Sequence, residues 1–154
     1  MVNEQATLTH PHRKAEESAV RGVIDELTAA VRLKNVDALV THCSSEVRTF
    51  DLVPPLQHVG VDAVRDVWKR TLQGFESPIE YEVHRLDVAV GDDIAFSRSL
   101  NRFGGMNRDG AHVVNWLCVT LGFGKVDGAW KILHQHVSVP IDMETGKALL
   151  GLRP

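Results

Sequence analysis

Residues 130–140 read WKILHQHVSVP, a strand-like segment whose side chains should alternate between the two faces of a sheet. One face then carries Trp130, Ile132, His134, His136 and Ser138, and the other carries Lys131, Leu133, Gln135, Val137 and Val139. Pro140 ends the segment because it has no backbone N–H to donate to a neighbouring strand. Two imidazoles that stand side by side among apolar residues indicate a lined cavity rather than a plain hydrophobic core.

Three further strand-like segments precede this one, and short links rich in glycine and aspartate join all four. Short links predict antiparallel neighbours, because a parallel connection needs a much longer crossover. The predicted strands of this meander are 79–90, 94–103, 111–123 and 130–139.

The first half of the chain has the three- and four-residue apolar spacing of amphipathic helices. The helices that this spacing predicts are 14–34, 37–43 and 62–72, with a short strand over 47–52. Helices followed by a meander predict an α+β domain, in which the helices pack on one face of a strongly curved, mainly antiparallel sheet.

The length of 154 residues fits one domain with a hydrophobic core of its own. Residues 1–12 are polar and contain Pro11, so we expect a flexible N-terminal arm there. The domain should then cover 13–139. Residues 140–154 should form a C-terminal tail over the surface or over a dimer partner.

The composition excludes several classes of protein. A hydrophobic content of 44% and a charged content of 24% are typical of a soluble globular domain. A net charge of −3 with scattered basic residues gives no electrostatic case for nucleic acid. No apolar run approaches the roughly 20 residues that span a bilayer, and the N-terminus lacks the apolar core of a secretory signal. Cys43 and Cys118 have no metal-type spacing, so we expect two reduced thiols in a cytoplasmic protein.

The strand predicted over 111–123 is largely apolar on both faces, which predicts that both faces are covered. One face carries His112, Val114, Trp116, Cys118 and Thr120, and the other carries Val113, Asn115, Leu117, Val119 and Leu121. The helices can cover one face. A second copy of the chain is the natural cover for the other, so we expect a homodimer through the sheet.

The order helix, helix, strand, helix and meander resembles the nuclear transport factor 2-like superfamily, which includes ketosteroid isomerase and the SnoaL-like polyketide cyclases. The resemblance covers about 17–154 and is closest to the SnoaL-like subgroup. Its most specific segments are Phe50–Leu56, Asp109-Gly110, Trp116–Thr120 and Trp130–Pro140. It implies a cone-shaped α+β barrel with a pocket between the concave sheet and the helices.

The resemblance also implies a site. In isomerase-like members an aspartate in the strand after the second helix acts as general base, and that position is Asp51. The oxyanion donors of the isomerase would fall near Leu27 and Cys118, neither of which is a strong donor. A histidine-glutamate-histidine motif of related proteins is present as His134-Gln135-His136. Steroid isomerisation is therefore not the expected reaction.

Asp51 lies between Phe50 and Leu52, beside the rigid corner Pro54-Pro55. Apolar surroundings disfavour the charged form of a carboxyl group, which would raise the pKa of Asp51 towards that of a useful base. The alternative role is a cap for the turn that leads to Gly60. The resemblance favours the role in the pocket.

His134 and His136 are candidate acid–base or hydrogen-bonding groups, because imidazole titrates near neutral pH. They could instead be hydrogen-bonded core histidines near a dimer edge. Together with His112 and Asp51 they could also offer three nitrogens and an oxygen to zinc or iron. Eight histidines make such a coincidence common, so we expect neither a metal nor any other cofactor.

Aromatic side chains are candidates for stacking on a flat ring. Phe50, Trp68 and Trp116 form this set, although core packing explains Trp68 equally well. His112 and Cys118 share the face of Trp116 and complete the expected substrate-binding residues. Cys118 is not expected to be a nucleophile, because no positive partner that would activate its thiol is evident.

The first functional hypothesis is a cofactor-independent enzyme of isomerase, cyclase or lyase type. Asp51 would remove a proton next to the carbonyl group of a cyclic substrate, and His134 or His136 would stabilise the enolate. The alternative is a binding module that holds an apolar metabolite in the same pocket without turnover. A dimerisation scaffold with a vestigial pocket is a third possibility, but it leaves the inward histidines without a role.

Overall fold

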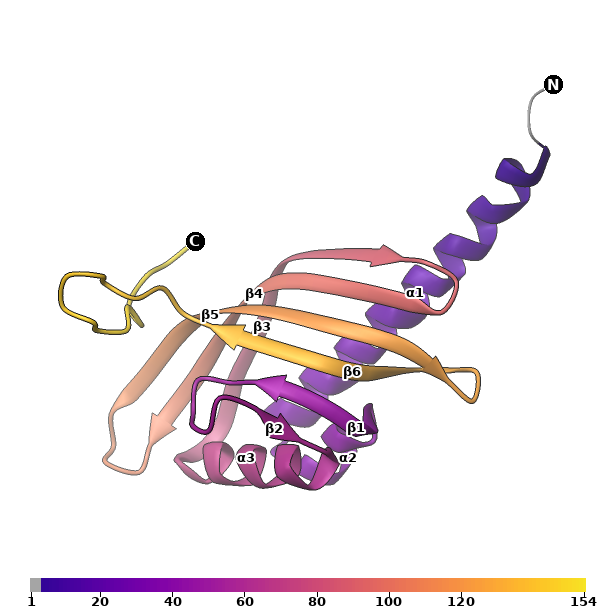
Figure 1. The fold of residues 1–154 in the computed structure, drawn as a ribbon. Helices are drawn as coiled ribbons and strands as arrows, with labels where there is room; N and C mark the ends of the chain where they lie inside the picture. Colours follow the sequence, from indigo (N-terminus) through magenta and orange to yellow (C-terminus); the bar gives the residue numbers. More distant parts are fainter. Residues whose placement is uncertain (1–3) are drawn as a thin grey trace.

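A computed structural model describes residues 4–154, with side chains described for residues 11–76 and 78–154 (Figure 1). The helices are α1 (Glu4–Arg32), α2 (Val36–Val40) and α3 (Val61–Gln73). The strands are β1 (Cys43–Phe50), β2 (His58–Val59), β3 (Phe75–Val90), β4 (Ile94–Asn107), β5 (His112–Val126) and β6 (Ala129–Ser138). The predicted α+β class is confirmed, and the predicted helices and strands occur in the expected order; the two-residue strand β2 was not predicted.

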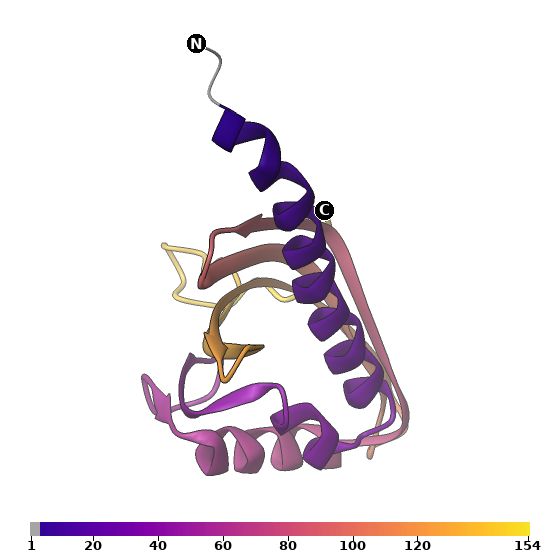
Figure 2. The same ribbon diagram turned by 90° about the vertical axis from the view of Figure 1, so that its right-hand side faces the viewer.

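The strands form one sheet in the order β2-β1-β6-β5-β4-β3. Every neighbouring pair is antiparallel except β1 and β6, which run parallel. The sheet curls into a half-barrel: α1 runs along its concave side, and α2 and α3 lie across one end (Figure 2). This arrangement is the expected cone. Within the described residues, no helix has the length and apolar content needed to cross a membrane.

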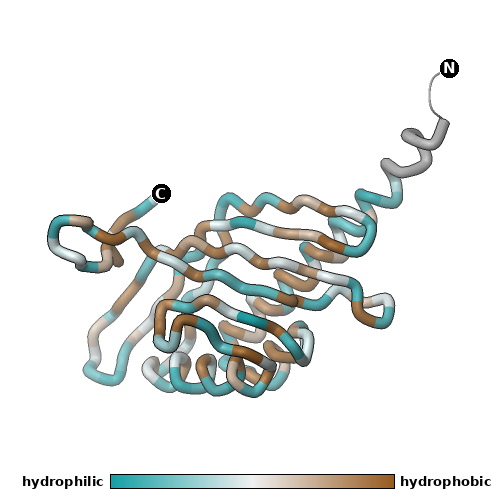
Figure 3. Tube along the Cα trace, viewed as in Figure 1, coloured by the Kyte–Doolittle hydropathy of each residue, from teal (hydrophilic) through white to brown (hydrophobic). Residues whose placement is uncertain are grey.

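The core lies where α1 meets the concave face of the sheet. Val20, Ile24, Leu27 and Val31 follow the three- and four-residue spacing of one helix face, and all four are buried. They belong to the same cluster as Phe123, which is fully buried on β5. Figure 3 shows polar and apolar residues interspersed along the strands, and on β5 the side that faces this core carries Val119, Leu121 and Phe123, all of them buried.

The N-terminal boundary differs from the prediction. Helix α1 begins at Glu4 rather than at Lys14, so the predicted arm over 1–12 is helical from Glu4 onward. Pro11 lies inside α1 and does not end it. Residues 1–3 of the predicted arm lie outside the described residues.

The strand β4 also continues beyond its predicted end at Phe103. Gly104 and Gly105 suggest a turn in the sequence, but both are within β4. A Cβ atom at Gly104 would lie 1.9 Å from the carbonyl oxygen of Val113. Glycine is needed here for the close approach of β4 and β5, and it does not mark the end of a strand.

The pairing of β5 and β6 contains a β-bulge that changes the expected faces. Phe123 pairs with Ile132, and the next residue back along β5, Gly122, pairs with His134. Leu133 is therefore an additional residue on β6 with no counterpart on β5. An additional residue shifts the alternation of side chains by one position, so every residue after Leu133 faces the side opposite to the prediction.

Candidate functional site

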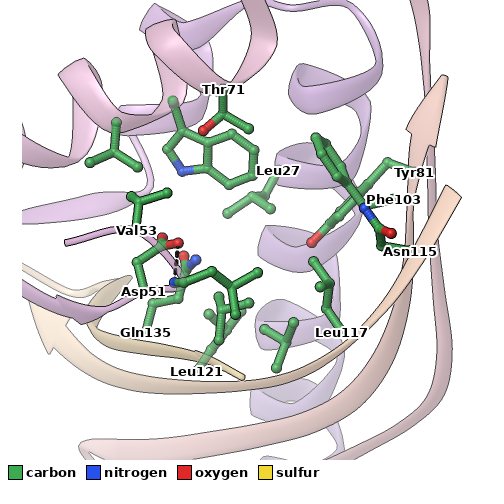
Figure 4. A pocket seen from close by; sticks show the side chains of 15 residues that line it. Leu27, Asp51, Val53, Thr71, Tyr81, Phe103, Asn115, Leu117, Leu121 and Gln135 are labelled. Atoms are coloured by element: carbon green, nitrogen blue, oxygen red, sulfur yellow. Dashed lines mark hydrogen bonds between the residues drawn. The ribbon is translucent and has the colours of Figure 1, made fainter. Parts of the chain in front are cut away.

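A cavity of about 160 Å³ opens between α1, α3 and the concave face of the sheet (Figure 4). An apolar cavity of about 150 Å³ is large enough for benzene, so this one can take a ring-sized molecule. Its lining is Leu27, Asp51, Leu52, Val53, Val67, Trp68, Thr71, Tyr81, Phe103, Asn115, Leu117, Val119, Leu121, Gln135 and Val137.

One polar group of the cavity is the carboxylate of Asp51, the residue that follows the last residue of β1. The side chain is half-buried, and its Oδ1 accepts a hydrogen bond of 2.6 Å from the backbone N–H of Leu52. Gln135 on the adjacent strand β6 also lines the cavity and is 8% exposed. The residue that follows β1 therefore supplies one acceptor, and β6 supplies one amide, to the same cavity.

A second polar group lies on the opposite side of the cavity, where Figure 4 shows Tyr81 across from Asp51. Tyr81 on β3 pairs with Phe103 on β4, which pairs with Asn115 on β5, so these residues form one row across the sheet. The hydroxyl of Tyr81 accepts a hydrogen bond of 2.6 Å from Nδ2 of Asn101. The amide Oδ1 of Asn101 in turn accepts one of 2.7 Å from Ser99 Oγ.

Burial controls the protonation of this tyrosine. It raises the pKa of Tyr81 to about 12, while the hydrogen bond from Asn101 acts in the opposite direction. The phenol therefore stays protonated throughout the physiological range, and its O–H group is available as a donor.

The cavity is mainly apolar and contains little charge. Among the described residues that line it, Asp51 and Tyr81 are the ionisable ones, and none is lysine, arginine or histidine. Trp68 from α3 and Phe103 from β4 provide aromatic surface. The ring of Phe103 makes an edge contact with Tyr81 at a centroid distance of 6.1 Å. The arrangement suits a neutral, largely apolar molecule with a few polar atoms.

Of the residues that the sequence singled out, the structure brings Asp51 and Trp68 together at the cavity. Leu27 also lines it, and as the resemblance implied, this position carries no hydrogen-bond donor. The catalytic and binding roles of Asp51 and Trp68 remain predictions.

His134 and His136 do not line the cavity, and the prediction of their face was wrong. Because of the bulge at Leu133, Gln135 and Val137 occupy the cavity side instead. The Nδ1 atom of His134 lies 2.9 Å from the carbonyl oxygen of Arg48.

Phe50 was expected to line the pocket, but its side chain is 41% exposed. Its ring lies 4.7 Å from that of His134 and 5.6 Å from that of His136. These three rings form a cluster on the outer face.

His112, Trp116 and Cys118 also lie on the outer face of the sheet rather than in the cavity. Nε2 of His112 is 2.6 Å from Glu80 Oε1, and the ring of Trp116 lies 4.9 Å from that of His84. Cys118 is exposed. The alternation predicted correctly which residues of β5 share a face. The face that lines the cavity, however, is the one opposite to Trp116. Both faces are largely apolar, so period two alone could not tell which is concave.

The histidines considered for a metal site are not brought together. His112 is bonded to Glu80, whereas His134 and His136 lie beside Phe50. In the part of the chain that the structure describes, no three side chains of histidine, cysteine, aspartate or glutamate are grouped to hold a metal ion.

Sequence reasoning missed the polar residues of the concave face. Tyr81, Asn115 and Gln135 line the cavity, and Ser99 and Asn101 support Tyr81 from β4. A signal was present in the alternation of β4, where Ser97, Ser99 and Asn101 occupy the side that also carries Phe103. Polar residues on a buried side indicate hydrogen-bonded groups, and often a site.

Comparisons with known proteins agree with this architecture. The family model described as a SnoaL-like domain matches residues 20–142. No curated protein matches the sequence. A crystal structure of an NTF2-like protein of unknown function from Pseudomonas putida KT2440 is 30% identical, with a TM-score of 0.83. The match covers 92% of this chain and 98% of that one.

Two more distant structures share the fold. A ketosteroid isomerase-like protein from Erwinia carotovora atroseptica is 17% identical with a TM-score of 0.69, over 80% of this chain and 95% of that one. The association domain of C. elegans CaMKII is 16% identical with a TM-score of 0.67, over 83% of this chain and 98% of that one. Identities this low establish the fold alone.

Proposed function

Because the chain belongs to the SnoaL-like domain family of the nuclear transport factor 2-like superfamily, we propose that it is a cofactor-independent small-molecule enzyme. Its substrate is a cyclic molecule that carries a carbonyl group, and its general base is Asp51. The observation that carries this proposal is a half-buried carboxylate in the wall of a mainly apolar cavity. A base in such a cavity can meet an acidic C–H bond with little competition from water.

The proposed first step is a proton transfer. Asp51 takes a proton from a carbon next to the carbonyl group, the electrons of the C–H bond move onto the carbonyl oxygen, and an enolate forms. In isomerisation, Asp51 returns the proton to another carbon. In cyclisation, the enolate attacks a second carbonyl group and the resulting alkoxide takes the proton from Asp51. In elimination, the β-hydroxyl group leaves with that proton as water. The name of one distant neighbour, a ketosteroid isomerase-like protein, supports this class of chemistry.

The test is solvent exchange. Acetophenone and small cyclic ketones are incubated with the protein in D2O, and loss of the protons next to the carbonyl group is followed by NMR. We expect Asp51→Asn to reduce the exchange rate by about 10²–10⁴-fold, the usual contribution of a general base. The control is Asp25→Asn, which changes an exposed carboxylate on α1 and should leave the rate unchanged. Equal exchange by all three proteins would remove Asp51 from the mechanism.

The alternative is a binding module without turnover that holds an apolar metabolite in the same cavity. The observation in its favour is that Leu27, where the isomerase resemblance implies a donor, offers the cavity only an apolar side chain. Binding without exchange in wild type would support this alternative. Binding that persists in Asp51→Asn while exchange is lost supports the enzyme.

The proposal includes a homodimer formed through the outer face of the sheet. Val114 and Trp116 are only partly buried there, and Trp116 offers the large surface typical of interface anchors. One structural neighbour is an association domain, which supports assembly through this fold.

A cytoplasmic location is also proposed, on the basis of the free thiols Cys43 and Cys118. A dimerisation scaffold without any ligand remains the third hypothesis.

A further inference from the structure

We propose that the hydroxyl group of Tyr81 donates a hydrogen bond to the oxygen of the ligand, and that the cavity selects uncharged ligands with a carbonyl oxygen. The inference rests on the proposed function in one respect, namely that the ligand occupies the same cavity. It concerns recognition of the oxygen and does not depend on catalysis by Asp51.

The first argument is the direction of the hydrogen bonds that reach Tyr81. Ser99 Oγ donates to Asn101 Oδ1 at 2.7 Å, which turns the Nδ2 group of Asn101 towards Tyr81. Nδ2 then donates to the hydroxyl oxygen of Tyr81 at 2.6 Å. The oxygen of Tyr81 is thus used as an acceptor, and its own proton remains. Among the described residues, no acceptor for this proton is found.

The second argument is the setting of this donor. Tyr81 is 6% exposed and is part of the cavity lining. The hydroxyl proton that Asn101 does not use therefore belongs to a residue that borders the space for the ligand. Asn101 is 3% exposed, so the supporting amide is held in a dry environment. Successive hydrogen bonds in such an environment polarise one another, which makes the last hydroxyl of the chain a better donor. Its raised pKa means that it approaches the ligand as a neutral phenol.

The third argument concerns charge. A carboxylate ligand would need a cation, and the described residues of the lining supply none. The carboxylate of Asp51 would repel such a ligand, because two like charges in a site of low dielectric are strongly disfavoured. An uncharged ligand with one acceptor oxygen satisfies Tyr81 without this cost. A ketone carbonyl group fits that description.

The test compares three single-ring probes of similar size. Acetophenone carries a carbonyl oxygen, α-methylstyrene has a methylene group in its place, and benzoate carries a negative charge. Dissociation constants are measured by isothermal titration calorimetry for wild type and Tyr81→Phe. We expect the preference of wild type for acetophenone over α-methylstyrene to fall by about three- to tenfold in Tyr81→Phe, the range of one hydrogen bond. The affinity for α-methylstyrene should stay the same, which also shows that the cavity is intact.

Two further measurements keep the test decisive if Tyr81→Phe is poorly folded. In wild type, the carbonyl stretching frequency of bound, isotope-labelled acetophenone should shift down relative to the free probe, as a donated hydrogen bond requires. Asn101→Asp keeps the tyrosine but gives its proton an acceptor within the protein. That variant should lose the ketone preference although the hydroxyl group is still present.

The outcomes separate this inference from the proposed catalysis. A ketone preference that persists in Tyr81→Phe, or an unshifted carbonyl frequency in wild type, overturns the role of Tyr81. Benzoate binding as tight as that of acetophenone overturns the selection of uncharged ligands. Failure of both neutral probes to bind wild type overturns the ligand class, and with it the proposed function. If wild type and Asp51→Asn exchange protons at the same rate while the ketone preference is intact, only the catalytic proposal is overturned.

Discussion

Ile132 and Gln135 lie on the same face of β6 although they are three positions apart in the sequence, an odd spacing that in a regular strand would place them on opposite faces. Both are buried, Ile132 in the core and Gln135 at the wall of the cavity. The bulge at Leu133 accounts for this, because it adds one residue between Ile132 and His134 without a partner on β5. A local irregularity in pairing therefore decides which side chains of the most informative segment reach the cavity.

This register gives a direct prediction for β6. His134→Ala and His136→Ala should each change the affinity for acetophenone by less than about twofold, because neither side chain lines the cavity. Gln135→Leu should change that affinity, since the amide of Gln135 does line it. Calorimetric titration of the three variants provides the check. A strong loss of affinity in the histidine variants, with Gln135→Leu unchanged, would contradict the register.

The core should depend strongly on Phe123. This side chain is 0% exposed and is part of the cluster that α1 closes. Phe123→Ala should lower the free energy of unfolding by about 3–5 kcal/mol, through lost burial and the cavity left behind. Val59→Ala on β2 is the control, because Val59 is 52% exposed and its truncation should cost less than about 1 kcal/mol. Urea denaturation at a fixed protein concentration measures the free energy of unfolding of both variants. An equal loss in the two would contradict the position of Phe123 in the core.

Glu16 should make the stability of the fold depend on pH. Hydrogen bonds from Lys125 Nζ at 2.8 Å and from Trp130 Nε1 at 2.6 Å lower the pKa of this carboxyl group below its ordinary value of 4.5. A lowered folded-state pKa contributes stability above the unfolded-state value, and this contribution is lost as the pH falls through the folded-state pKa. Glu16→Gln should therefore be less stable than wild type at neutral pH, and the two should converge in acid.

Thermal unfolding between neutral pH and strong acid tests this prediction. Glu46→Gln serves as the matched control, because Glu46 is exposed on β1 and has no ion pair among the described residues. A difference between wild type and Glu16→Gln that stays constant down to strong acid would argue against the role of the carboxylate.

The proposed dimer depends on the outer face of β5. Trp116→Glu places a charge on that face, and it should weaken self-association by at least about tenfold, as expected when an aromatic anchor is removed. Val59→Glu on the short strand β2 is a control at a position that is 52% exposed and outside the proposed interface. Sedimentation equilibrium measures both variants. Association that is unaffected by Trp116→Glu would exclude this face as the interface.

Much of the fold could be read from the sequence. The spacing of Val23, Leu27 and Val31 marks an amphipathic helix, and alternation over 111–123 separates the two sides of β5 correctly. These signals are local, because they arise from the periods of helix and strand. The helix boundary at Glu4 was missed because proline at position 11 looks like a breaker when its context is unknown.

The candidate site was less accessible. Asp51 was found through the resemblance, and its position at the end of a strand is a local property. Tyr81 was missed because nothing near it in the sequence indicates that Asn101, twenty residues later, would donate to its hydroxyl group. Contacts between strands depend on register, which the sequence of one strand does not contain.

The sequence by itself determined the elements, their order and the two faces of each regular strand, because these follow from local periodicity. Only the tertiary structure decided which face became concave and where a β-bulge shifts the alternation of side chains along β6. Curvature and register are set by packing against α1 and by the pairing of distant strands. For that reason the paired histidines lie outside the cavity, and the carboxylate that follows β1 shares it with a tyrosine from β3.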